Sequence, residues 1–233
     1  MRSGIIILSA AILFSGYVLA QKAYFQPRVV NFPTEDGGTV TGHLYGSGKR
    51  GVVLVHGGRY RKESWRRQAN QLTDAGFRVL SIDLRGFGRS RGPGQDDVYS
   101  APLHLDVLAA VRYLREQGAR SVAVIGGSLG GGAGADAVTE ARPGEIDRLI
   151  TLGGLMWNKN PEKVNVPLLV IITKDDASGS GPRLPGIQAS FDKIPPGQKR
   201  IEILEGSAHA QAMFETDDAD RIMAMVIKFL KER

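Results

Sequence analysis

A serine flanked by small residues is the clearest chemical signal in this sequence. Ser128 lies in the run Gly-Gly-Ser-Leu-Gly-Gly, which follows the apolar stretch 121–125 and leads into an Ala- and Gly-rich stretch. Glycines two residues before and after a serine allow a sharp turn from a strand into a helix. Such a turn places the hydroxyl at the end of a sheet, beside the free amides of a helix N-terminus. The pattern predicts a nucleophile elbow with Ser128 as the attacking group; the alternative is a glycine-rich turn with an idle serine.

Two further groups that a reactive serine requires occur downstream of it. A serine hydroxyl is a weak nucleophile at neutral pH, so it needs a general base, and the base needs an acid that orients it. His209 is the one of the four histidines that follows both Ser128 and a carboxylate at the end of a predicted strand. Of the adjacent pair Asp175 and Asp176, the reach from the start of the preceding strand favours Asp176 as the acid. Asp175 is the alternative acid, because the two neighbouring side chains cannot both face the imidazole.

A second pair of glycines follows an apolar strand nearer the N-terminus. In the run Val-His-Gly-Gly at 55–58, the glycines would let the backbone come close to the oxygen of a bound carbonyl group. We expect the amides of Gly58 and Leu129 to form an oxyanion hole, in which the loss of one donor costs about 3 kcal/mol of transition-state stabilisation. His56 would shape this turn rather than act as a base. The alternative is a simple glycine-rich turn.

The elements that must position these groups follow from the hydrophobic pattern. Apolar, β-branched runs alternate with stretches of helical period, which predicts βαβ units and a mostly parallel sheet. The candidate catalytic groups then follow the carboxyl ends of strands, where open α/β sheets have their active sites. The stretch 175–185, rich in Ser, Gly and Pro, is expected to be irregular and mobile. Strands are expected at 29–32, 39–45, 51–55, 78–82, 121–125, 146–152, 168–172 and 200–204, and helices at 62–75, 101–117, 129–141 and 214–230.

The N-terminal segment predicts export. A basic residue after Met1, an apolar run and small residues up to Ala20 are typical of a secretory signal peptide spanning residues 1–20, which would place the protein in the periplasm or outside the cell. The alternative is an uncleaved membrane anchor, because this stretch is at the lower limit for spanning a bilayer. Residues 21–233 are enough for a single α/β domain.

Composition narrows the chemistry further. The chain has no cysteine, which excludes disulfides, thiolate metal sites and a cysteine nucleophile. The formal net charge is +6, and the segment 59–67 concentrates basic residues. This segment is either the solvated face of a surface helix or a basic rim that attracts anionic substrates. No nucleic-acid-binding module is recognisable, so nucleic acid is not an expected partner. No metal or organic cofactor is expected.

Taken together, these motifs resemble the α/β-hydrolase superfamily, and the resemblance spans nearly all of the chain after Gln21. The compact size is similar to the dienelactone-hydrolase-like branch, although Ser128 stands where true dienelactone hydrolases have cysteine. The resemblance implies an α/β-hydrolase fold, with a mostly parallel central sheet and helices on both faces. The segment 83–90 is a strand-to-turn signature of the superfamily and is expected to be structural. The motifs lie at 52–58, 82–90, 126–131, 174–176 and 206–209.

The connection 153–166 is too short for a cap domain, which predicts an open pocket. Its residues Leu155, Met156 and Trp157 are candidate pocket walls, with ordinary core contacts as the alternative.

The sequence predicts a serine hydrolase of the carboxylesterase type, acting on small-molecule esters or thioesters. In this reading Ser128 attacks the carbonyl carbon, His209 transfers the proton and Asp176 orients the histidine, with an acyl-enzyme as intermediate. An amidase or peptidase would use the same triad. A non-catalytic binding protein of the cell envelope, or a membrane-tethered interaction protein using the basic segment 59–67, are further alternatives.

Overall fold

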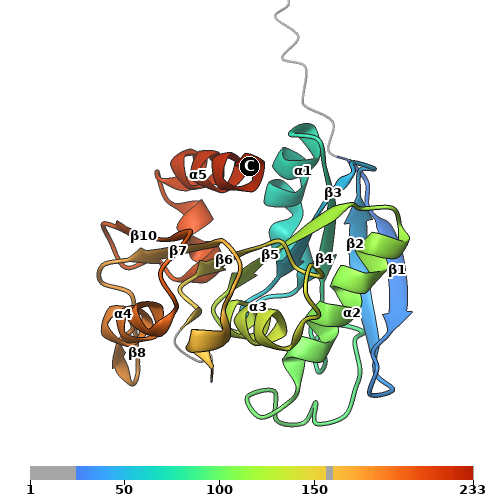
Figure 1. Ribbon diagram of the computed structural model, residues 1–233, viewed down its shortest axis with the longest axis horizontal. Helices are drawn as coiled ribbons and strands as arrows, with labels where there is room; N and C mark the ends of the chain where they lie inside the picture. The colour runs from blue at the N-terminus through green and yellow to red at the C-terminus, as the bar shows by residue number, and fades with distance from the viewer. Residues whose placement is uncertain (1–24, 156–159, 233) are drawn as a thin grey trace, which may run out of the picture.

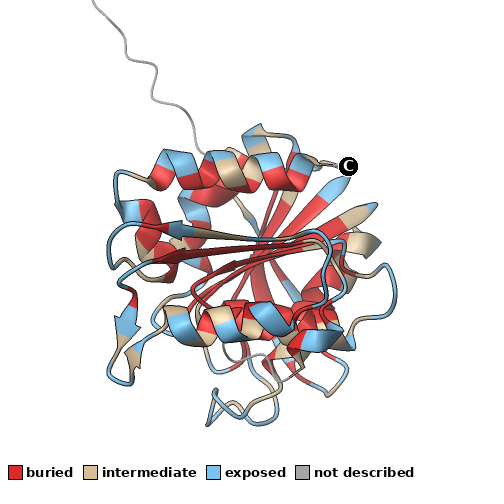
Figure 2. Cartoon of the chain, turned by 60° about the vertical axis from the view of Figure 1, so that its left-hand side comes forward, coloured by how far each residue is buried: buried red, intermediate tan, exposed pale blue. Residues whose placement is uncertain are grey.

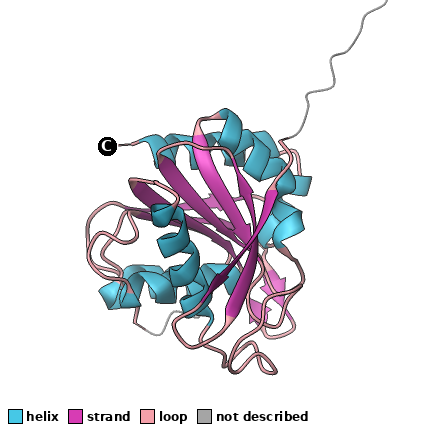
Figure 3. Ribbon diagram, turned by 90° about the vertical axis from the view of Figure 1, so that its right-hand side faces the viewer, coloured by secondary structure: helices cyan, strands magenta, loops and turns pink. Residues whose placement is uncertain are grey.

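A mostly parallel sheet forms the centre of the fold (Figure 1). The computed structural model describes residues 25–155 and 160–232. The eight strands of the sheet lie in the order β1-β2-β4-β3-β5-β6-β7-β10 and twist across the molecule (Figure 3). Strand β2 pairs antiparallel with β1 and β4, and the remaining pairs are parallel. The strands are β1 (Arg28–Pro33), β2 (Thr39–Tyr45), β3 (Arg50–Val55), β4 (Phe77–Ile82), β5 (Ser121–Gly127), β6 (Arg148–Leu152), β7 (Leu168–Thr173) and β10 (Lys199–Leu204).

Helices cover both faces of this sheet and turn their buried sides toward it (Figure 2). One face carries α2 (Leu103–Glu116), α3 (Leu129–Glu140) and α4 (Leu184–Lys193). The other carries α1 (Arg66–Asp74) and α5 (Ala219–Lys231). The predicted α/β fold class, with a mostly parallel sheet and helices on both faces, is confirmed.

Burial on both faces accounts for the apolar sequences of the central strands. Strands β3, β5 and β7 are buried along almost their whole length, because helices lie on both sides, and they are therefore continuously apolar. Helix α3 is rich in Ala and Gly because it lies close to the sheet. A Cβ placed on Gly134 would come within 3.0 Å of the Val124 side chain. This close packing holds the middle of α3 directly against β5.

All eight sheet strands match the predicted segments to within about two residues, but the helices differ more. The helix expected at 62–75 begins as a 3₁₀ turn over Lys62–Trp65 before α1. The helix expected from 214 begins only at Ala219, after the 3₁₀ helix Ala210–Glu215.

A small hairpin and a helix were absent from the prediction. The stretch expected to be irregular contains a small hairpin of β8 (Ala177–Ser178) and β9 (Gly181–Pro182). Helix α4 follows it. Pro185 is tolerated because it lies in the first turn, Gly186 weakens the helical propensity, and the burial of Ile187 and Phe191 overrides this weakness.

Some predictions lie outside the described residues. These are the signal peptide over residues 1–20 with its alternative as an anchor, and the candidate pocket walls Met156 and Trp157. Within residues 25–155 and 160–232, no helix is both long and apolar enough to cross a bilayer.

Candidate active site

The turn from β5 into α3 holds Ser128 in an unusual backbone conformation. Its φ is 49°, a value that residues with side chains rarely adopt. Its amide donates to the carbonyl oxygen of Leu152 at 2.9 Å. A Cβ on Gly126 would collide with the carbonyl oxygen of Gly130, and one on Gly130 would lie 2.5 Å from that of Val55. The glycines around the serine are therefore required by close backbone approach, as expected for a nucleophile elbow.

Asp176 and His209 meet at the carboxyl ends of the strands, where Ser128 also lies. The Nδ1 atom of His209 lies 2.7 Å from Oδ2 of Asp176. The Asp176 side chain is completely buried, whereas that of His209 is 28% exposed. The neighbouring Asp175 is exposed, and its amide donates to the carbonyl oxygen of Gly206. Of the two candidate acids, the structure brings Asp176 to the histidine.

The other oxygen of Asp176 faces a cation. Nε of Arg183 lies 3.2 Å from Oδ1, and the Arg183 amide donates to the Asp176 carbonyl oxygen at 2.9 Å. Arg183 comes directly after the β8–β9 hairpin, so this hairpin brings a second charged partner to the acid. Nothing in the sequence pattern singles out Arg183.

Two consecutive glycines after β6 lie behind these groups. A Cβ on Gly153, whose φ is 62°, would come within 2.9 Å of Oδ2 of Asp176 and 3.0 Å of Nδ1 of His209. A Cβ on Gly154 would collide with the carbonyl oxygen of Ser128. The end of β6 thus borders the serine turn on one side and the Asp–His pair on the other, which brings the three predicted catalytic residues to one place. The glycine pair itself was a signal that the sequence analysis did not use.

The predicted oxyanion amides also lie beside the serine. A Cβ on Gly57 would be 3.3 Å from Cβ of Ser128, and one on Gly58 would be 3.7 Å from the Leu129 side chain. The Gly57 amide donates to Oε1 of Gln211 at 3.2 Å. In the described part of the chain, the amides of Gly58 and Leu129 have no protein acceptor. These two N–H groups are therefore left to bind an oxygen.

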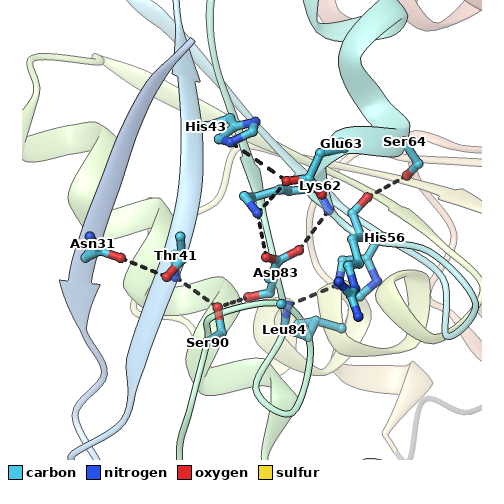
Figure 4. A network of polar contacts seen from close by, with 12 residues as sticks. Asn31, Thr41, His43, His56, Lys62, Glu63, Ser64, Asp83, Leu84 and Ser90 are labelled. Carbon is cyan, nitrogen blue, oxygen red and sulfur yellow. Dashed lines mark hydrogen bonds and ion pairs between the residues drawn. The ribbon is translucent and has the colours of Figure 1, made fainter.

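His56 is buried and engaged at both ring nitrogens (Figure 4). Nε2 accepts the Leu84 amide at 3.2 Å, so Nδ1 carries the proton and donates it to the carbonyl oxygen of Gly57 at 2.8 Å. The ring also meets Phe87 edge-on, with 4.7 Å between centroids. Burial lowers the pKa of His56, which keeps the ring neutral. Its contacts shape the turn, as expected, and leave it no free nitrogen for proton transfer.

The segment 83–90 is held by buried polar contacts (Figure 4). The carboxylate of Asp83 accepts hydrogen bonds from both the amide and the ammonium group of Lys62, at 2.9 and 2.8 Å. Burial alone would lower the pKa of Lys62, but hydrogen bonds to Asp83 and Glu63 raise it overall. Ser90 donates to the Asp83 carbonyl oxygen and accepts the Thr41 amide, which joins the segment to β2. These contacts give the segment a structural role.

The basic segment 59–67 is not one uniform charged surface. Lys62 is buried against Asp83, and Arg67 lies 3.4 Å from Asp220 at the surface. Arg59 and Arg61 are exposed in the stretch that follows Gly58. Among the residues that the structure describes, no group of three or more His, Asp or Glu side chains is arranged to hold a metal ion. Leu155, a candidate pocket wall, is completely buried in the core.

Comparisons with known proteins agree with this fold. Residues 51–190 match the family model described as alpha/beta hydrolase fold. A non-heme haloperoxidase of Rhodococcus erythropolis is 30% identical over 210 residues, covering 80% of this chain and 74% of that protein. An epoxide hydrolase of Caballeronia sordidicola is 42% identical over 53 residues, which cover 23% of this chain and only 16% of that protein. The solved esterase Pf2001 of Pyrococcus furiosus superposes with a TM-score of 0.75 at 18% identity, covering 89% of this chain and 92% of that one.

Proposed function

The chain belongs to the α/β-hydrolase fold family, and from this we propose that it is a serine hydrolase that cleaves carboxylic esters or thioesters of small molecules. A hydrolase function is what the family as a whole supports. The observation that carries the finer proposal is the 2.7 Å contact between His209 and the buried Asp176, at the edge of the sheet where Ser128 forms a strained turn. The esterase that superposes on this chain is consistent with this substrate class.

The proposed mechanism gives a part to each group. Because Nδ1 of His209 is held by Asp176, Nε2 is the nitrogen that takes the proton from the Ser128 hydroxyl as the oxygen attacks the carbonyl carbon. The amides of Gly58 and Leu129 stabilise the resulting oxyanion. The tetrahedral intermediate collapses when Nε2–H passes its proton to the leaving alkoxide or thiolate, which leaves an acyl group on Ser128. Water then attacks this acyl-enzyme by the same route and releases the acid.

Asp176 acts through the histidine rather than on the substrate. Its carboxylate accepts the Nδ1–H proton, which fixes the tautomer, and its charge stabilises the imidazolium that forms during each transfer. Its complete burial keeps this interaction away from water, where it would be weaker.

The first test is labelling with a fluorophosphonate, read by intact mass, on the wild type, Ser128→Ala and His209→Ala. The wild type is expected to gain one adduct and both variants none, because the probe reacts only with an activated serine. Circular dichroism on each protein provides the control for folding. A folded wild type that gains no adduct would contradict the proposal, and a labelled one leads to a panel of esters, thioesters and amides.

The choice of acid has a matched pair of variants in adjacent positions. Asp176→Asn should lower kcat on the order of 10³-fold or more, because the amide no longer holds the correct tautomer of His209. Asp175→Asn removes the same charge from the neighbouring residue, which is exposed, and should leave kcat within about twofold. Steady-state rates on one activated ester compare the two, and the reverse result would reassign the acid.

A further inference from the structure

Gln211 connects the loop of the candidate base to the loop of the candidate oxyanion hole. It lies two residues after His209 and is 4% exposed. Its Oε1 accepts the Gly57 amide at 3.2 Å, and its Nε2 donates to the Ser64 hydroxyl at 3.2 Å. One buried side chain thus joins the segment after β10 to the segment after β3.

The backbone around Gln211 leaves space for this side chain and little else. A Cβ on Gly127 would lie 2.5 Å from Oε1 of Gln211, and one on Gly57 would lie 3.2 Å from it. The amide group therefore lies between Gly127, the residue before Ser128, and Gly57. A Cβ on Gly127 would have to displace this amide group, whereas one on Gly57 would require it to move by only a few tenths of an ångström.

The chain bends sharply to put Gln211 there. Ala210 has a φ of 52° and shares this rare conformation with Ser128 among the described non-glycine residues. Strained residues persist where the surrounding structure requires them, and they are frequent at functional sites. The bend lets His209 meet Asp176 while the side chain two residues later reaches Gly57.

Both peptide units that flank the Gly57 α-carbon are held. The first is held at its N–H by Gln211, and the second at its carbonyl oxygen by Nδ1–H of His56 and by the Tyr60 amide. In a trans peptide the N–H points away from the carbonyl of the same plane. Fixing the Gly57 carbonyl toward His56 and Tyr60 therefore fixes the direction of the Gly58 N–H.

We propose that Gln211 is a positioning residue of the oxyanion hole: it holds Gly57 so that the Gly58 amide stays aimed at the oxygen of the transition state. The proposal rests on the proposed serine-hydrolase function, which supplies that oxygen. Gln211 touches no reacting atom in this account and acts through Gly57 alone. Its second hydrogen bond, from Nε2 to the Ser64 hydroxyl, does not involve Gly57.

The test compares Gln211→Met with Ser64→Ala. Methionine keeps the length of the side chain but has no acceptor as strong as an amide oxygen for the Gly57 amide, whereas Ser64→Ala removes only the partner at the other end. On an activated ester we expect Gln211→Met to lower kcat about 10- to 100-fold with KM within about twofold, because the loss is felt in the transition state. Ser64→Ala should keep kcat within about threefold.

A second measurement distinguishes a positioning role of Gln211 from a general loss of rigidity at the site. A trifluoromethyl ketone adds to an activated serine to give a hemiketal oxyanion, so its affinity reports on the oxyanion hole. Its inhibition constant should rise in Gln211→Met by about the same factor as kcat/KM falls. Equal losses in both variants, or a loss confined to KM, would overturn the proposal. A wild type that resists fluorophosphonate overturns the serine-hydrolase function as well, whereas a labelled wild type with an unaltered Gln211→Met variant overturns this inference alone.

Discussion

At the scale of single residues, the candidate site depends on positions where a side chain is missing. Gly153 is one of them: its φ is 62°, and the space beside its α-carbon is taken by Asp176 and His209. The backbone here is the wall against which the Asp–His pair is packed. A methyl group would have to displace one of two side chains that the proposed mechanism needs in fixed positions.

Gly153→Ala should therefore lower both activity and stability. We expect kcat to fall at least about tenfold, because the imidazole is displaced from the serine. The free energy of unfolding should fall by about 1–2 kcal/mol from the left-handed backbone alone. Ester turnover and urea denaturation measure the two effects. Gly179→Ala is the matched control, since a Cβ there meets nothing within 4 Å; equal behaviour of the two variants would contradict the account.

Residues whose side-chain chemistry fits the proposed reaction could be predicted from the sequence. Residues that matter only through their neighbours in three dimensions could not. Ser128, His209 and Asp176 were assigned because their types and order fit one reaction. Gln211 and Gly153 do no chemistry themselves, and their importance comes from what lies beside them in three dimensions. Arg183 falls in the same group, because only the hairpin turn brings it to Asp176.

At the scale of elements, one buried arginine ties three of them together. Arg85, in the loop after β4, is completely buried. Its guanidinium contacts Asp106 near the start of α2, at 2.8 and 3.0 Å, and Asp36 in the turn between β1 and β2. The hydrogen bond from Arg85 is the main cause that lowers the pKa of Asp36 to about 2. Burial raises the pKa of Asp106 despite its contact with Arg85.

Replacing Arg85 should be costly in a way that depends on pH. Arg85→Met leaves the Asp106 carboxylate buried without its cation, which should destabilise the protein by about 3–5 kcal/mol at pH 7. The cost should shrink toward pH 5, because the Asp106 carboxyl, whose pKa burial raises, then takes up a proton. Urea denaturation at the two pH values measures this. Arg67→Met, which breaks an exposed pair with Asp220, should cost less than about 1 kcal/mol at either pH.

The strands were more predictable than the helices for a physical reason. A strand buried on both faces is apolar throughout and is bounded by glycine or polar turns, so its limits can be read locally. Helix α4 combines a proline and a glycine with only a few apolar residues, and it is stabilised by tertiary burial of Ile187 and Phe191. The order of the strands depends on pairing between distant segments, which no local pattern of residues encodes, and it was not predicted.

At the scale of the whole molecule, one sheet separates two apolar layers. Neighbouring residues on a strand point to opposite faces, so Leu149 packs into the layer under α2, α3 and α4 while Ile150 packs into the layer under α1 and α5. Both side chains are completely buried. Because the layers share every strand between them, we expect them to unfold together.

Leu149→Ala and Ile150→Ala test this coupling, one on each face. Each should cost about 2–5 kcal/mol, and each should shift the same single transition. Far-ultraviolet circular dichroism follows the whole fold, and tryptophan fluorescence includes Trp65, which is buried in the second layer. Curves from the two probes that separate in either variant would show that the layers are independent.

Strand β10 is the last strand of the sheet, and the loop that leaves it carries both His209 and Gln211. Ser128 is anchored on β5 in the interior of the sheet. Edge elements open at a lower free-energy cost than central ones. Mild warming would therefore separate His209, the proposed base, from Ser128, the proposed nucleophile, while Ser128 is still in place. Such a molecule would be inactive as a catalyst while it is still almost fully folded. On cooling it would regain activity when β10 and the loop after it pack again.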